Sequence, residues 1–152
     1  MQHVMLDLYD CNAQLLANEA FLRRVLDEYP DLIGMEKVSP VELRYIATSD
    51  PLDAGHSGFV IIATSHVSLH AWPAYRMVNM DIFSCEPFDR EVVTRFAMTT
   101  FQARNVEVHV VERATRSPRR AERNRARRER PAVEPDEFPG RKSPFEIPDI
   151  VF

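Results

Sequence analysis

The sequence predicts an α+β protein, a two-layer α/β sandwich in which a mostly antiparallel sheet carries two helices on one face. Three observations predict this class. Two amphipathic runs repeat with the spacing of surface helices, several short runs are apolar or alternating as in strands, and the central strands follow one another closely, which favours antiparallel pairing. With 152 residues, 45% of them hydrophobic, the chain is long enough for one domain with a sizeable core.

The first elements are a strand and a helix. Residues 3–9 are rich in β-branched and aromatic side chains, which indicates a strand. Asn12 then offers a cap for an amphipathic helix over residues 13–29, whose apolar stripe is typical of a helix packed on a sheet. We expect Pro30 to end this helix.

The middle of the chain predicts four strands. Residues 41–48 alternate, whereas residues 49–58 contain glycine, proline and aspartate and are expected to form a loop. Two continuous apolar runs, residues 59–63 and 67–72, are short enough to be buried strands, and residues 76–85 alternate cleanly. One side of that last strand is apolar and the other is polar; the two sets are Val78, Met80 and Ile82, and Asn79, Asp81, Phe83 and Cys85.

The predicted domain ends with a second helix and a strand. Asp89 caps a helix over residues 90–104, and residues 106–111 return as a strand. We therefore expect the domain to span residues 1–113.

Residues 114–152 are expected to be a mostly disordered tail, because few apolar groups are available there to offset the entropy of ordering. Residues 113–130 hold nine arginines against two glutamates, although the whole chain has a net charge of -4. Weak binding of a polyanion such as nucleic acid is one interpretation of this tail, and a solvated segment without a partner is the other. Residues 145–152 are apolar enough to dock as a short extended segment.

Composition and motifs exclude several classes. No apolar run approaches the roughly 18 residues of a membrane span, and residues 1–10 do not look like a secretory signal, so a cytoplasmic protein is expected. Cys11 and Cys85 are too few and too far apart for a disulfide framework or a zinc ribbon. The sequence has no glycine-rich phosphate loop, and residues 55–58 lack the last glycine of a nucleophile elbow, which argues against nucleotide-triphosphatases and serine hydrolases.

Reactive and polar side chains gather in the segment that should be the apolar centre of the sheet. They are Ser57, Ser65, His66, Ser68, His70, Trp72, Asp81 and Cys85. Buried polar groups cost free energy unless they are partnered, so this cluster indicates a functional site. Four strand residues span roughly 13 Å, too far for His66 and His70 to share a metal ion, and no metal site is expected.

The same segment resembles a known family. Residues 57–73 read SGFVIIATSHVSLHAWP and residues 81–85 read DIFSC. This pattern resembles the core signature of the bacterial and archaeal S-adenosylmethionine decarboxylases, which is roughly S-G, an apolar run, E-S-H-x-x-I-H-T-W-P-E and then D-x-F-T-C. A weaker likeness extends over residues 3–112.

The resemblance implies a self-processing, pyruvoyl-dependent decarboxylase of polyamine synthesis, with an α/β sandwich that forms a homodimer. In such proenzymes a serine hydroxyl attacks the preceding carbonyl, the resulting ester eliminates, and the new N-terminal residue becomes a pyruvoyl group. Thr64 and Ser65 match these two positions, which would give a β-chain of residues 1–64 and an α-chain that begins at residue 65. The pyruvoyl ketone then forms a Schiff base with the substrate amine and serves as the electron sink when carbon dioxide leaves.

Four further residues match functional positions of that family. Ser57 and His70 match processing residues, and His70 is also counted with Ser65 and Cys85 as catalytic. Cys85 matches the proton donor, and a thiol with a pKa near 8.5 can donate a proton at neutral pH. Trp72 is expected to contact the substrate. Because Ser65 and His70 would face opposite sides of an unbroken strand, a bend or bulge near Ser65 is expected.

Two departures from the family pattern leave alternatives open. Thr64 replaces a glutamate, although only the main-chain carbonyl of this residue is attacked. Ala74 replaces the glutamate that would hold the ribose hydroxyls of S-adenosylmethionine, so a smaller basic amino acid, ornithine or arginine, is an alternative substrate. A non-catalytic, unprocessed family member that acts as a binding or regulatory subunit is the alternative from another class.

Overall fold

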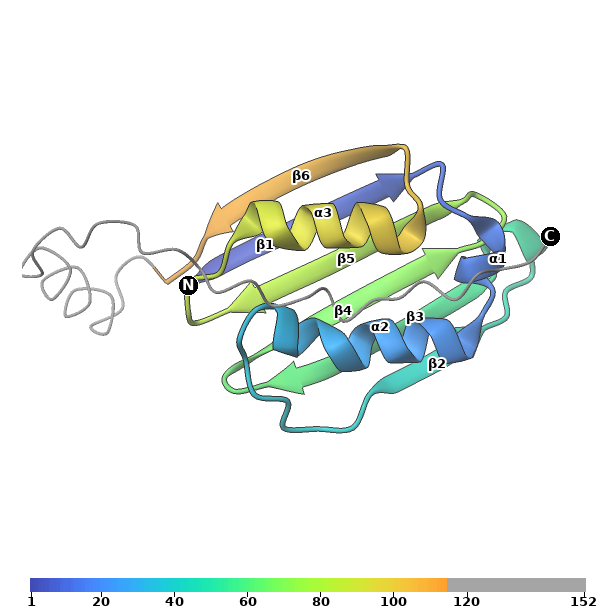
Figure 1. Ribbon diagram of the computed structural model, residues 1–152. Coiled ribbons are helices and arrows are strands. Elements are labelled where there is room, and N and C mark those ends of the chain that lie inside the picture. Colours follow the sequence, from blue (N-terminus) through green and yellow to red (C-terminus); the bar gives the residue numbers. More distant parts are fainter. Residues whose placement is uncertain (115–152) are drawn as a thin grey trace, which may run out of the picture. The chain divides into compact units, whose positions relative to one another are not determined.

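The computed structural model describes residues 1–114, which form a six-stranded sheet and three α-helices (Figure 1). The predictions for the tail, including polyanion binding and docking of residues 145–152, lie outside the described residues. In chain order the elements are β1 (Gln2–Tyr9), α1 (Ala13–Leu16), α2 (Glu19–Leu32), β2 (Glu42–Ile46), the 3-10 turn η1 (Pro51–Asp53), β3 (Gly55–Ile62), β4 (Ser65–Trp72), β5 (Met77–Ser84), α3 (Arg90–Phe101) and β6 (Asn105–Glu112).

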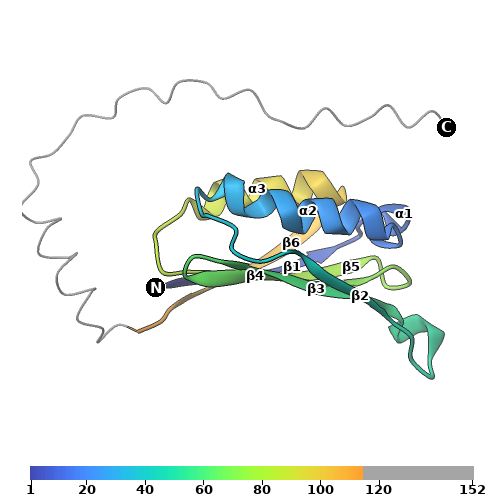
Figure 2. The same ribbon diagram turned by 90° about the horizontal axis from the view of Figure 1, so that it is seen from below.

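The sheet has the strand order β2-β3-β4-β5-β1-β6, and every neighbouring pair is antiparallel. Helices α2 and α3 lie side by side on one face, as the view along the sheet shows (Figure 2). The predicted two-layer sandwich is therefore confirmed. We call the face that is turned away from the helices the open face.

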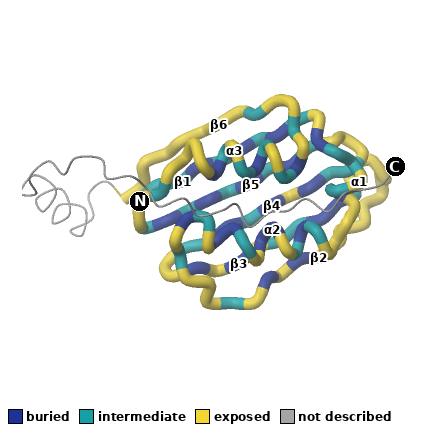
Figure 3. The backbone as a smooth tube through the Cα atoms, viewed as in Figure 1, coloured by how far each residue is buried: buried dark blue, intermediate teal, exposed yellow. Residues whose placement is uncertain are grey.

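The core lies between the helices and the sheet. Alternate residues of the central strands point into it and are buried, including Val4, Leu6 and Leu8 of β1, Val67, Leu69 and Ala71 of β4, and Val78, Met80 and Ile82 of β5. Figure 3 shows this burial along the middle of the sheet, with exposed backbone along β6. The buried Tyr29 hydroxyl of α2 donates to the Val93 carbonyl of α3 over 2.8 Å, which ties the two helices together. The intervening side chains of each strand are left to the open face.

The first predicted helix is divided in two. Asn12 caps α1 as expected, since its side chain accepts a hydrogen bond from the Gln14 amide. The chain then leaves the helix, and Asn18 caps α2 by accepting from the Phe21 amide at 3.0 Å. The expectation that Pro30 ends the helix is wrong, because α2 continues to Leu32. A proline so near the end removes only one internal hydrogen bond, and its ring already has a helical φ.

The loop expected over residues 49–58 is shorter than predicted, because β3 begins at Gly55. The glycines here serve close packing of backbones rather than a turn. A side chain at Gly55 would overlap the Ala71 carbonyl oxygen of β4, and one at Gly58 would crowd Glu42 and Leu43 of β2. Ser57 is thereby held in a strand, opposite His70.

None of the helices in residues 1–114 has the length and apolar character needed to cross a membrane.

Candidate active site

The turn between β3 and β4 holds the predicted cleavage point. Ile62 pairs with Ser65, so only Ala63 and Thr64 lie between the two strands. The Ser65 hydroxyl oxygen is buried, and in the described part of the chain it has no hydrogen-bond partner. A buried hydroxyl without a partner is costly, so this position is poorly explained by stability alone.

Cys85 meets this turn from β5. It follows the last residue of that strand, and its thiol donates to the Thr64 carbonyl oxygen over 3.1 Å. The Ser84 hydroxyl accepts the Glu86 amide at 3.0 Å and fixes the chain on the far side of Cys85. The structure thus places Thr64, Ser65 and Cys85 at one end of the sheet.

An aromatic and cationic cluster lies beside this group on the open face. Phe83 is opposite His66 of β4 and His3 of β1, and its ring centre is 5.7 Å and 5.5 Å from theirs. His3 also contacts the Asp81 carboxylate at 3.0 Å. The guanidinium carbon of Arg113 lies 4.6 Å from the centre of the Phe83 ring.

Ser57 and His70 form a second group. They face each other across β3 and β4, and the His70 Nδ1 atom is 3.0 Å from the Ser57 oxygen. The Trp72 ring, two residues further along β4, has its centre 5.9 Å from that of His70. A hydroxyl, an imidazole and an indole are therefore close together on the open face.

The two groups do not meet within one chain. The bend or bulge expected near Ser65 is absent from β4, because its pairing with β3 and β5 runs without interruption from its start to Trp72. Five residues of strand separate Ser65 from His70, or roughly 16 Å. The sequence argument was right that the parity of the strand forbids contact, but the chain does not bend to restore it.

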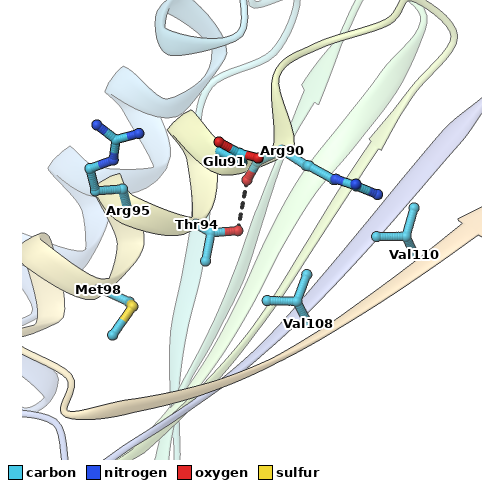
Figure 4. Close-up of a pocket in the computed structure, with 7 residues that line it drawn as sticks. All are labelled: Arg90, Glu91, Thr94, Arg95, Met98, Val108 and Val110. Atoms are coloured by element: carbon cyan, nitrogen blue, oxygen red, sulfur yellow. Dashed lines mark hydrogen bonds between the residues drawn. The ribbon is translucent and has the colours of Figure 1, made fainter.

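A groove of about 780 Å³ lies on the open face over β2, β3 and β4. Ser57 and His70 line it together with His66 and Ser68, whereas Thr64, Ser65 and Cys85 are not among its lining residues. A second groove of about 520 Å³ lies between α3 and β6 (Figure 4), where Met98, Val108 and Val110 supply its apolar lining. None of the predicted site residues lines that second groove.

Comparisons with known proteins identify the family. The sequence profile of the S-adenosylmethionine decarboxylases matches residues 2–114. The chain is 32% identical over 113 residues to the S-adenosylmethionine decarboxylase proenzyme of Archaeoglobus fulgidus, which covers 74% of this chain and 96% of that protein. It is 30% identical over 111 residues to the proenzyme of Thermosipho melanesiensis, covering 73% and 80%. The chain belongs to the S-adenosylmethionine decarboxylase family.

The fold of this decarboxylase family member also matches a solved structure. The crystal structure of the adenosylmethionine decarboxylase from Aquifex aeolicus aligns with a TM-score of 0.62 at 23% identity, over 74% of this chain and 88% of that one. At this identity the match shows a shared fold.

Sequence reasoning missed the residues that approach from the two outer strands. His3 of β1 and Arg113 after β6 reach the candidate site only because β1 and β6 pair next to β5. The available signal was the polar side of the strand over residues 76–85, which required partners. Asp7, Glu107 and His109 also place possible metal-ligand atoms within 4.8 Å of one another on the open face, which the sequence did not predict.

The other cysteine of this family member is buried in the core. Burial raises the pKa of the Cys11 thiol to about 11, so this group stays protonated at neutral pH. Cys85 is only partly buried, and its thiol contacts the Thr64 carbonyl oxygen.

Proposed function

We propose that the protein is a self-processing, pyruvoyl-dependent S-adenosylmethionine decarboxylase of polyamine synthesis; the cytoplasmic location expected from the sequence is part of this proposal. The observation that carries it is the contact at Thr64. The carbonyl to be attacked accepts a hydrogen bond from Cys85, and the next residue holds a buried hydroxyl without a partner among the described residues.

These residues fit the cleavage reaction. The Ser65 oxygen bonds to the Thr64 carbonyl carbon, the peptide C–N bond breaks, and the hydroxyl proton passes to the freed nitrogen, which leaves an ester. Loss of the Ser65 α-proton to a base then expels the Thr64 carboxylate. Hydrolysis of the remaining unsaturated residue releases ammonia and leaves the pyruvoyl group. The Cys85 thiol stabilises the negative charge that develops on the Thr64 oxygen in the first step.

The pyruvoyl group supplies an electrophilic ketone that accepts the electrons of the carbon–carbon bond broken in decarboxylation. Residues of the chain would supply the proton and hold the substrate. Cys85, beside residue 65, holds a proton for the substrate carbon once carbon dioxide has left. The Trp72 and Phe83 rings offer apolar surfaces on which the substrate can be held.

The distance between Ser65 and His70 supports a homodimer. Within one chain the imidazole is too far away to serve as the base, whereas a second copy can bring its Ser57 and His70 to the first copy's Ser65. Phe59 and Ile61 on the open face are 43% and 44% exposed and supply apolar surface for such a contact.

One observation favours a basic amino acid, ornithine or arginine, as the second candidate substrate. Ala74 lies exposed in the turn after Trp72, and its methyl group accepts no hydrogen bond from a ribose. The neighbouring Tyr75 hydroxyl donates to the Asp53 carboxylate at 3.1 Å, which raises the pKa of Tyr75. The Asp53 carboxylate of η1 therefore lies next to this turn, where it would attract a cationic side chain.

Intact mass and released carbon dioxide test the proposal together. We expect purified wild-type protein to consist of residues 1–64 and of an α-chain with a blocked residue 65, whereas Ser65→Ala stays a single 17.6 kDa chain without activity. Ser49→Ala, an exposed loop serine, is the matched control and should cleave normally. Carboxyl-labelled S-adenosylmethionine, ornithine and arginine, supplied separately, rank the substrates. An uncleaved wild-type chain that is stable for days would instead support the non-catalytic family member.

A further inference from the structure

Arg113 is fixed at the same end of the sheet as the candidate cleavage point. It follows β6, and its amide donates to the Met1 carbonyl at 2.9 Å, while its own carbonyl accepts from the Met1 amino group at 3.2 Å. These hydrogen bonds extend the pairing of β1 with β6 by one residue. The side chain is exposed, so its position is set by the contacts it makes on the surface.

The Phe83 ring holds the guanidinium in place. A distance of 4.6 Å between the guanidinium carbon and the ring centre is typical of a stacked cation–π contact. Phe83 shares the open face with Cys85, two residues later, and lies opposite His66, which follows Ser65. The positive charge of Arg113 is therefore presented on the open face, at the end of the sheet where Thr64, Ser65 and Cys85 lie.

The guanidinium has no anionic partner in the described part of the chain. Among residues 1–114 no carboxylate lies within ion-pair distance of Arg113, and its side chain donates no hydrogen bond there. Asp81, on the same face, is engaged by His3 at 3.0 Å. By contrast, Arg23 is paired with Glu19 at 2.9 Å. Stacking uses the flat side of the guanidinium and leaves its N–H edge free for a planar anion.

We propose that Arg113 binds the α-carboxylate of the amino-acid substrate. This inference rests on the proposed function and names the residue that recognises the group to be lost. A bidentate contact between guanidinium and carboxylate would hold the substrate with its amine directed toward residue 65. Arg113 is a binding residue and takes no part in cleavage of the proenzyme.

The chemistry of the reaction predicts how this contact affects the kinetics. The carboxylate carries a full negative charge in the bound substrate, and this charge is dispersed as carbon dioxide forms. An arginine contact is therefore stronger with the substrate than with the transition state. Its removal should raise KM and leave kcat unchanged or higher.

The experiment compares Arg113→Gln and Arg113→Lys with wild type, using the full chain after self-cleavage. Arg95→Gln, an exposed arginine of α3 on the other side of the sheet, is the charge-matched control. Three quantities are measured: the extent of cleavage by intact mass, KM and kcat for S-adenosylmethionine, and the inhibition constant of decarboxylated S-adenosylmethionine, which lacks the carboxylate. If wild type turns over only ornithine or arginine, that amino acid and its decarboxylated amine replace this pair.

We expect normal cleavage in all variants, a KM at least 10-fold higher in Arg113→Gln with kcat within about 3-fold of wild type, and a smaller rise in Arg113→Lys. Inhibition by the decarboxylated amine should be unchanged, and Arg95→Gln should behave as wild type. A KM within 2-fold of wild type in Arg113→Gln, or equal weakening of substrate and amine, overturns the inference alone. A wild-type chain that is neither cleaved nor active overturns the proposed function and the inference with it.

Discussion

Cys85 has two roles in the proposed reaction, and each role requires a different property of its side chain. In the intact chain its thiol donates to the Thr64 carbonyl oxygen, which lies on the bond to be broken. After cleavage the same thiol would serve as an acid. The first role needs any hydrogen-bond donor of similar size, whereas the second needs a group whose pKa lies near neutrality.

Substitutions at this residue should therefore divide the two roles. We expect Cys85→Ala to cleave about 5-fold more slowly, the worth of one neutral hydrogen bond of about 1 kcal/mol, and to lose decarboxylation. Cys85→Ser retains a donor, so it should cleave close to the wild-type rate and still lose turnover, because a hydroxyl is a much weaker acid than a thiol. Time courses of intact mass and of released carbon dioxide measure the two effects. Wild-type cleavage in Cys85→Ala would show that the contact with Thr64 does not assist the attack.

At the scale of single elements, β3 is organised by its glycines. Gly55 lies so close to β4 that a Cβ atom would overlap the Ala71 carbonyl oxygen, and this backbone cannot move without disturbing the pairing. Gly34, in contrast, has a φ of 68° with nothing within 4 Å of an added Cβ. Gly34 is needed for its backbone angle, and Gly55 is needed for space.

This difference predicts that one substitution destabilises the protein and another does not. Each is made in a Ser65→Ala chain, so that self-cleavage does not complicate the unfolding measurement. Gly55→Ala should lower the free energy of unfolding by about 1 to 3 kcal/mol through overpacking. Gly34→Asn should change it by less than about 0.5 kcal/mol, because asparagine tolerates a positive φ. Urea unfolding followed by circular dichroism measures both. A neutral Gly55→Ala would mean that β3 and β4 can separate locally at no cost.

The helices and strands also show which parts of the fold could be predicted from the sequence. Periodicity located every long helix and strand of residues 1–114, because burial on one face imposes a repeat of 3.6 or 2 residues. It failed at Pro30 and at Gly55, where residue types that often end elements lie inside them. A glycine can be needed either for a turn or for close packing of two backbones. Which of the two applies depends on the strand that lies beside it, and the sequence around the glycine does not identify that strand.

For the candidate site, the sequence named candidate residues but did not predict which of them lie close together. Contact of Ser57 with His70 depends on β3 beginning at Gly55, whereas the sequence placed Ser57 in a loop. The positions of His3 and Arg113 depend on β1 pairing with both β5 and β6. These pairs join residues far apart in the chain, from Leu8 with Val78 to Gln2 with Glu112. Long-range strand order of this kind leaves no local trace in the sequence.

At the scale of the whole molecule, the separation of Ser65 from His70 is the main constraint on the mechanism. The continuous pairing of β4 keeps them roughly 16 Å apart, and sliding the strand by one residue would turn every side chain of β4 to the wrong face. In the proposed homodimer, a second copy would supply the imidazole and leave the core of each copy unchanged. The proposal of a homodimer thus follows from the same regular pairing that stabilises the sheet.

Co-expression of two inactive variants tests this arrangement. Ser65→Ala lacks the nucleophile but keeps Ser57 and His70, whereas His70→Ala keeps the nucleophile. If processing residues act across the dimer, the His70→Ala chain, uncleaved or slowly cleaved alone, should be cleaved in mixed dimers. If equal amounts of the two chains pair at random, about half of the His70→Ala chains are in mixed dimers and should be cleaved. A mass tag distinguishes these chains from the Ser65→Ala chains. The matched control pairs Ser65→Ala with Cys85→Ala: the contact of Cys85 with Thr64 lies within one chain, so mixing should not accelerate that slower cleavage. Absence of rescue in the first pair, or rescue in both, would contradict a site shared in this way.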